Sequence, residues 1–70
     1  MKRYAVVIER TDANYSGYVP DLPGCVATGA TPYEAETELR TAIAFHIAGL
    51  IEDGLPIPDP TSTCTYIEAP

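Results

Sequence analysis

Alternating polar and apolar side chains near the start of the chain predict three short β-strands joined by turns. Residues 2–9 carry apolar side chains on both sides of the alternation, which is typical of a central strand covered on both faces. Residues 15–19 alternate in the same way and end at Pro20, because proline cannot donate a ladder hydrogen bond. Residues 25–29 form a third run. We therefore expect a three-stranded antiparallel meander.

A long helix is predicted after these strands by signals at both of its ends. Thr31 can cap the first turn, Pro32 suits the first helical position, and Glu34 can complete a capping box. The helical pattern continues to about Asp53, and Gly54 suits a left-handed stop. The stripe expected to pack on the sheet consists of Ala35, Leu39, Ala42, Ile43, His46 and Leu50.

The remaining residues predict an extended return and a last strand. Proline at every second position from Pro56 to Pro60 excludes a helix and predicts an extended connection that crosses the molecule. Residues 63–68 are rich in β-forming side chains, which predicts a fourth strand. The expected fold class is therefore α+β, a two-layer βββαβ domain over residues 1–70 with one helix on one face of the sheet.

The charge balance limits what this fold can bind. Four Lys and Arg residues against ten Asp and Glu residues give a net charge of −6. We expect no direct nucleic-acid binding, because cations are needed to displace phosphate counterions, and the charge favours a basic partner. A domain of 70 residues is also small, and one helix leaves a sheet face bare. Both features favour self-association, as a dimer or a tetramer.

Nothing in the sequence predicts secretion or a membrane span. The apolar run 5–8 is too short for a signal peptide, and no stretch approaches the about 20 apolar residues of a span. Cys25 and Cys64 lie too far apart for a CxxC redox pair or half of a zinc site. We expect both to be reduced and half-buried rather than joined in a disulfide, as in a cytoplasmic protein.

The helix face opposite the sheet carries the candidate partner-binding residues. These are Glu34, Glu38, Phe45 and Glu52, and Asp21 joins them as an acidic residue in the loop after the second strand. One interpretation is a solvated face with a single exposed aromatic side chain. The other is a docking stripe for a basic partner, with Phe45 as its anchor, because aromatic anchors ringed by polar groups are typical of interfaces.

The residues favour binding over catalysis. His46 is the only histidine and lies in the apolar stripe, so a core histidine satisfied by a hydrogen bond is favoured over a general base. No set of side chains has metal-ligand spacing, and we expect no catalytic residue, metal or cofactor. A magnesium-dependent nuclease remains an alternative, and it requires Glu9 to lie near a second carboxylate.

One string of residues is more specific than a generic turn and helix start. Asp-Leu-Pro-Gly-Cys at 21–25 is followed by Gly-x-Thr-x-x-Glu-Ala at 29–35. The positions that carry the pattern are Pro20, Asp21, Leu22, Pro23, Gly24, Cys25, Gly29, Thr31, Glu34, Ala35, His46 and Gly54. With these residues the chain resembles the HicB-like antitoxin family of type II toxin–antitoxin systems over nearly its whole length.

The resemblance implies a partial ribonuclease-H-like fold, with the last strand parallel to the first. It also implies an antitoxin that binds and blocks a small basic mRNA-cleaving toxin of the HicA-like type, without hydrolysing RNA itself. Many members of the family carry a C-terminal DNA-binding module. This chain ends at Pro70, directly after the predicted last strand, so we expect a short form without that module. An orphan homo-oligomeric adaptor is the alternative.

Overall fold

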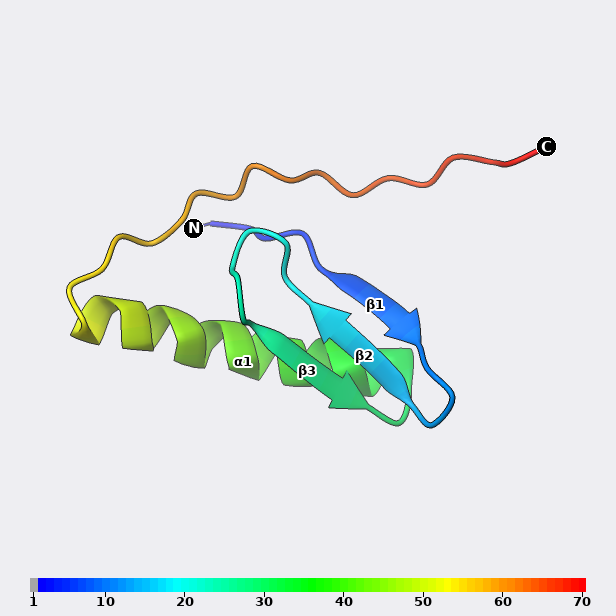
Figure 1. Ribbon diagram of the computed structural model, residues 1–70, viewed down its shortest axis with the longest axis horizontal. Helices are drawn as coiled ribbons and strands as arrows, with labels where there is room; N and C mark the ends of the chain where they lie inside the picture. The colour runs from blue at the N-terminus through cyan, green and yellow to red at the C-terminus, as the bar shows by residue number, and fades with distance from the viewer. Residues whose placement is uncertain (1) are drawn as a thin grey trace.

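The three predicted strands form one antiparallel sheet in the computed structural model, which describes residues 2–70 (Figure 1). The strands are β1 (Val7–Arg10), β2 (Tyr15–Tyr18) and β3 (Val26–Gly29). They lie in the order β1-β2-β3, with both pairs antiparallel. The predicted meander is therefore confirmed.

The first strand is shorter than predicted and lies at the edge of this sheet. Its ladder with β2 starts only at Val7, which pairs with Tyr18, the last residue of β2. Beyond Tyr18 the chain enters a loop, because Pro20 has no N–H to donate to a ladder. The prediction of a central first strand is wrong for this sheet, in which β2 is central. It would hold only if residues 63–68 paired with the outer edge of β1.

The loop between β2 and β3 closes on itself, as its sequence predicts. The Cys25 N–H donates to the Leu22 carbonyl oxygen at 3.0 Å, and the Val19 N–H donates to the Cys25 carbonyl oxygen at 3.2 Å. Gly24 has a φ of +85°, the left-handed conformation that the third position of a type II turn requires. The closed turn carries Leu22, which is fully buried, into the core.

The helix α1 (Pro32–Glu52) begins and ends where the sequence predicts. The Thr31 hydroxyl oxygen accepts a hydrogen bond from the Glu34 N–H at 3.0 Å, which satisfies one of the free donors of the first turn. Asp53 is the C-terminal cap, and Gly54 follows with a φ of +68°. This left-handed glycine ends the helix and lets the chain turn back over the molecule.

Close packing of α1 on the sheet depends on two glycines in the strands. A Cβ atom at Gly17 would lie 2.5 Å from the Leu39 side chain, and one at Gly29 would lie 2.8 Å from the carbonyl carbon of Glu34. Ala35 and Leu39 are accordingly buried in the core, as predicted. The core is completed by the loop side chains of Val19, Leu22 and Cys25.

Further along α1 the predicted stripe is less buried. Ala42, Ile43, His46 and Leu50 are all half-buried, and of these Ala42 and Ile43 pack against the core. The reason is length, because a helix of 21 residues extends well beyond strands of four residues, as Figure 1 shows. No helix within residues 2–70 is long and apolar enough to cross a membrane.

After α1 the chain returns in extended form beside residues 2–6, as the alternating prolines predict. The Lys2 ammonium pairs with the Asp59 carboxylate at 2.9 Å, and the Tyr4 hydroxyl donates to the Pro58 carbonyl oxygen. Residues 63–68 then run in the same direction as β1 but are not a strand of the sheet. Within residues 2–70, one hydrogen bond links residues 63–68 to the chain at β1: the Cys64 thiol donates to the Val6 carbonyl oxygen.

The close contact at Gly29 gives a direct test of the packing. We expect Gly29→Ala to destabilise the fold by about 1–3 kcal/mol, because its Cβ would collide with backbone atoms of the first turn of α1, which cannot move alone. The matched control is Gly49→Ala, where a Cβ meets nothing within 4 Å.

In the interior of α1, Gly49→Ala should be neutral or stabilising by up to about 1 kcal/mol, because alanine favours a helix. Urea denaturation followed by circular dichroism measures both variants. Equal stabilities for the two would contradict the proposed close packing.

Candidate partner-binding surface

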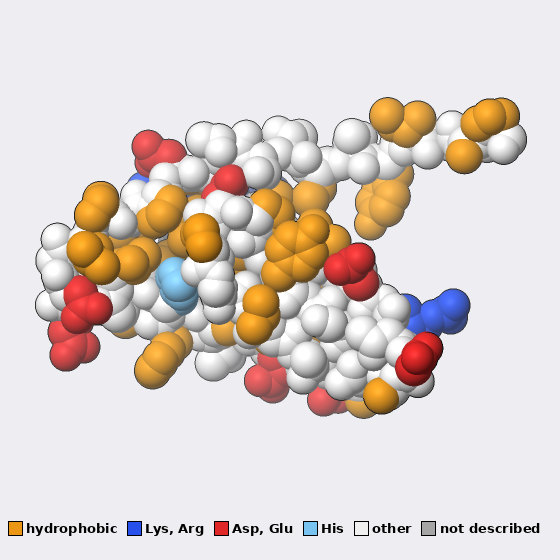
Figure 2. Space-filling view, viewed as in Figure 1, with side chains coloured by type: hydrophobic (Ala, Val, Ile, Leu, Met, Phe, Trp, Pro, Cys, Tyr) orange, Lys and Arg blue, Asp and Glu red, His pale blue; other side chains and the backbone are white. Residues whose placement is uncertain are grey.

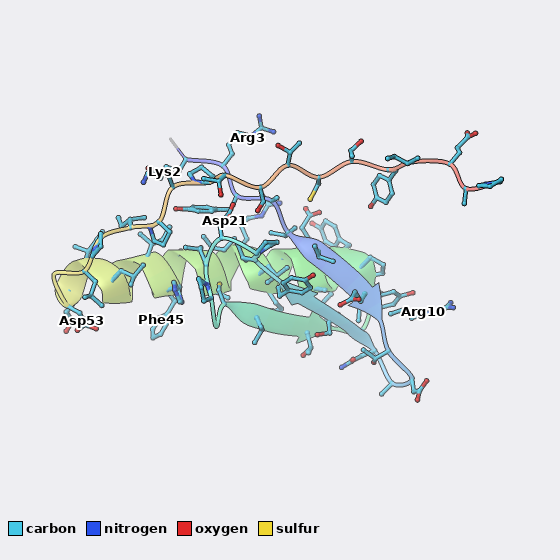
Figure 3. All side chains as sticks on the ribbon, turned by 45° about the horizontal axis from the view of Figure 1, so that its top comes forward. Lys2, Arg3, Arg10, Asp21, Phe45 and Asp53 are labelled. Atoms are coloured by element: carbon cyan, nitrogen blue, oxygen red, sulfur yellow. The ribbon has the colours of Figure 1, made fainter. Side chains whose placement is uncertain are left out.

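The acidic residues predicted on the outer face of α1 are all exposed. Their stripe flanks the buried stripe instead of lying opposite it, because Glu34 and Glu38 directly precede the buried Ala35 and Leu39. Glu34, Glu38 and Glu52 are exposed, and Phe45 is 82% exposed, although it is a large aromatic residue. Figure 3 shows Phe45 projecting from α1 away from the C-terminal segment. We call these four residues the acidic strip.

The acidic strip is long and narrow. At a rise of about 1.5 Å per residue, Glu34 and Glu52 lie roughly 27 Å apart along the helix axis. Glu34 and Glu38 are one turn apart, and Phe45 lies near the middle of the strip. The strip therefore suits a partner that lies along the helix rather than one that inserts a single side chain.

The charges of the strip are not neutralised within the described chain. Arg40 pairs at 2.8 Å with Glu36 on another side of the helix, and no ion pair within residues 2–70 involves Glu34, Glu38 or Glu52. Glu34 and Glu38 repel each other mildly at their i,i+4 spacing. The strip thus presents negative charge to solvent next to an exposed phenyl ring.

Glu52 occupies an unfavourable position in its own helix. It is the last residue of α1, whose final turn contains no basic residue. The helix dipole places partial negative charge at this end, so a carboxylate there costs a few tenths of a kcal/mol to about 1 kcal/mol. A cation from a partner would relieve both the dipole and the like charges.

Asp21 does not lie on the acidic strip. It sits in the loop between β2 and β3, where Figure 3 shows it beneath the C-terminal segment. Its carboxylate accepts four hydrogen bonds from Thr61 and Ser62: two from the backbone N–H groups, at 3.0 and 2.9 Å, and two from the hydroxyls, at 3.2 and 2.9 Å. We call this arrangement the Asp21 latch.

The Asp21 latch is a favourable site for a charged carboxylate. The N–H and hydroxyl of Ser62, followed by those of Thr61, lower the pKa of Asp21 below its ordinary value. The structure therefore gives this side chain an intramolecular role that sequence reasoning missed. Its predicted contact with a partner stays a prediction. The polar Thr-Ser pair directly after the proline run is the signal that could have indicated the latch.

The two cysteines are free, as predicted, but they differ in exposure. Cys25 is buried, and burial raises the pKa of its thiol. Cys64 is exposed rather than half-buried, because the C-terminal segment stands off from the sheet.

The nuclease alternative gains no site from the geometry. Glu9 lies opposite Ser16 in the ladder between β1 and β2, on the sheet face away from α1. Within residues 2–70, no three side chains of the His, Cys, Asp and Glu types gather closely enough to hold a metal ion.

The motif residues have physical roles in this structure. Gly24 provides the left-handed turn, Leu22 and Cys25 enter the core, Gly29 makes room for α1, and Thr31 caps it. The motif therefore encodes the junction between the sheet and the helix, with Asp21 tying the C-terminal segment to it.

The sequence matches a known protein family over nearly its whole length. The model of a family described as "HicB_like antitoxin of bacterial toxin-antitoxin system" matches residues 4–70. The chain belongs to the HicB-like antitoxin family. An uncharacterized 14.9 kDa protein in the rep-hol intergenic region of Haemophilus phage HP1 (strain HP1c1) is 39% identical over 67 residues, 96% of this chain. Those residues are 50% of the phage protein, so the chain spans about half the length of this relative.

A solved structure agrees with the family. A chain in the structure described as "HicA3 and HicB3 toxin-antitoxin complex" matches 86% of this chain with a TM-score of 0.74 and 33% sequence identity. The match covers 70% of that chain. The α+β arrangement of three antiparallel strands and one helix is therefore an arrangement found in an assembled toxin–antitoxin complex.

The Asp21 latch can be tested by removing its acceptor. We expect Asp21→Ala to release residues 61 and 62, so that their amides exchange with solvent faster while the midpoint of global unfolding changes little. Asp12→Ala is the control, because Asp12 is exposed and its side chain makes no hydrogen bond within residues 2–70. Hydrogen exchange followed by NMR measures both variants.

Acid should act on the latch in the same direction. A carboxylate whose folded-state pKa is lowered stabilises the native contact above its ordinary pKa of 3.8, and this stabilisation is lost as the pH falls through the lowered value. The Ser62 amide resonance should therefore titrate below pH 3.8. Unchanged exchange in Asp21→Ala would refute the latch.

Proposed function

We propose that this chain is an antitoxin-like binding module that neutralises a small basic mRNA-cleaving toxin of the HicA type by direct binding. The observation that carries the proposal is the structural match to a chain of a toxin–antitoxin complex over most of this domain. The family match over residues 4–70 supports it independently. The chemistry required of the chain is binding, and no catalytic group of its own takes part.

The charge distribution supports a basic partner. The chain carries a net charge of −6, and the acidic strip presents three carboxylates without ion-pair partners in the described chain. Charge complementarity of this kind mainly raises the association rate and excludes wrong partners. Phe45, at 82% exposure, offers the apolar area that holds a formed complex together.

We also propose that the domain has a partial ribonuclease-H-like fold. In a partial ribonuclease-H-like arrangement, residues 63–68 form a fourth strand parallel to β1. The direction of the C-terminal segment beside β1 and the contact between Cys64 and Val6 support this arrangement.

Reversing two charges tests the acidic strip. The toxin for the test is any short basic protein that an adjacent open reading frame encodes and that co-purifies with this chain. We expect Glu34→Lys/Glu38→Lys to slow association roughly tenfold at low salt and to flatten the salt dependence of the rate. Stopped-flow measurements at several ionic strengths give both quantities.

The control for this experiment is Glu9→Lys/Asp12→Lys, which makes the same change in net charge on the hairpin between β1 and β2. If both double variants slow association equally, only the total charge matters. If neither does, the acidic strip is not the binding face. Absence of any binding protein would favour the orphan adaptor.

Phe45 should control the lifetime of the complex instead of its formation. We expect Phe45→Ala to weaken binding by about 2 kcal/mol or more, mostly through faster dissociation. Tyr33→Ala is a matched control, because Tyr33 is 79% exposed on the same helix but lies on a different face. Surface plasmon resonance gives the two dissociation rates, and equal losses for both variants would remove Phe45 as the anchor.

A further inference from the structure

The C-terminal segment has the properties of an unpaired strand. Residues 63–68 are extended and exposed, with Tyr66 at 100% and Ile67 at 88% exposure. Figure 2 shows hydrophobic side chains standing clear of the body along the far end of this segment. A segment with free backbone donors and acceptors and apolar side chains on both sides is a template for pairing with another strand.

The position of the segment is fixed at one end. The Asp21 latch holds residues 61 and 62, and the pair between Lys2 and Asp59 holds the residues before them. After residue 62, a cleft of about 420 Å³ lies between the C-terminal segment and β1. It is lined by residues 6–8 and 63–66, none of which is charged. The segment can therefore close against β1 on one side, which leaves its other edge open.

We propose that the open edge pairs with the same segment of a second copy of this chain, antiparallel across a two-fold axis. The two sheets would then join through residues 63–68 into one continuous sheet. This pairing surface is separate from the acidic strip and stands whether or not a toxin binds there.

Charge selects a second copy as the occupant. Residues 60–67 contain no charged side chain, in a chain whose net charge is −6. Two copies repel each other wherever acidic residues face acidic residues, so an uncharged edge is where they can approach. A basic partner would find no counter-charge along these residues, whereas the acidic strip offers one.

The single acidic residue of the segment also fixes the direction of pairing. In a parallel in-register pair, Glu68 of one copy would face Glu68 of the other, and like charges directly opposite each other are destabilising. An antiparallel pair places Glu68 opposite an uncharged residue earlier in the segment. A two-fold axis produces this antiparallel arrangement and closes the assembly at two copies.

The side chains of the segment can supply a useful part of the interface. A buried tyrosine removes about 150–250 Å² from solvent. The two Tyr66 side chains would therefore contribute roughly a third to a half of the about 1,000 Å² that a specific interface requires. Ile67 adds to this area from the other side of the strand.

Sedimentation equilibrium of the wild-type chain and of Thr65→Pro tests the proposal. We expect the wild type to be a dimer and Thr65→Pro to raise the dimer dissociation constant at least tenfold, because proline removes a ladder donor at the centre of the segment. The matched control is Ala69→Pro, which lies beyond residues 63–68 and should leave the dimer intact. Unchanged circular dichroism shows that the domain itself remains folded.

A second variant and a second measurement guard against an indirect effect. Tyr66→Glu should also weaken the dimer, because it places charge in the uncharged edge. Amides of residues 63–68 should gain protection from hydrogen exchange as the protein concentration rises.

A monomer at every concentration would overturn the proposal, as would protection that does not depend on concentration, which indicates pairing with β1 alone. It would equally be overturned by a dimer that survives Thr65→Pro and Tyr66→Glu but is lost in Val26→Lys. That result would place the contact on the sheet face away from α1.

Discussion

The close approach of α1 to the sheet at Gly17 and Gly29 is the constraint on which the rest of the structure depends. Without side chains at these two strand positions, Leu39 and Ala35 can reach the backbone of the sheet and become buried. The core is otherwise small and consists of three side chains from one closed loop. Fixing the helix by these contacts also fixes its rotation, and the rotation decides which residues of α1 face solvent. The acidic strip is thus a consequence of where the strands have no Cβ atoms.

A single helix on a three-stranded sheet leaves surfaces that differ in chemistry. One exposed stripe of α1 is acidic and carries Phe45, whereas the edge formed by residues 63–68 has Glu68 as its single charged residue and carries Tyr66. A chain of net charge −6 cannot use an acidic face to bind itself, but it can use that face to attract a basic protein. The division of charge between helix and C-terminal segment would therefore keep the two proposed associations on separate surfaces of one small domain.

Sequence reasoning succeeded where local chemistry determines the structure. The turn at Gly24, the cap at Thr31 and the end of α1 at Gly54 each depend on a few neighbouring residues whose conformational preferences are strong. The rotation of α1 followed from helical periodicity, which located Glu34, Glu38, Phe45 and Glu52 on the exposed face. Reasoning failed where contacts join distant parts of the chain. The Asp21 latch spans 40 residues to Thr61, and nothing in the loop motif indicates its partner. The edge position of β1 and the exposure of Cys64 follow from where the C-terminal segment lies, which the β-forming character of residues 63–68 does not determine.

The Asp21 latch links the motif of the family to both surfaces. Leu22 and Cys25 anchor the loop between β2 and β3 in the core, which fixes the position of Asp21. Because Asp21 binds Ser62, the start of the C-terminal segment is then fixed relative to β1. The same motif continues through Gly29 and Thr31 into α1, where it sets the start of the acidic strip. One stretch of chain therefore positions a face suited to a basic partner and an edge suited to a second copy. Because the two surfaces are carried by different elements, occupation of one leaves the side chains of the other free, and a paired antitoxin could hold one partner on the helix of each copy.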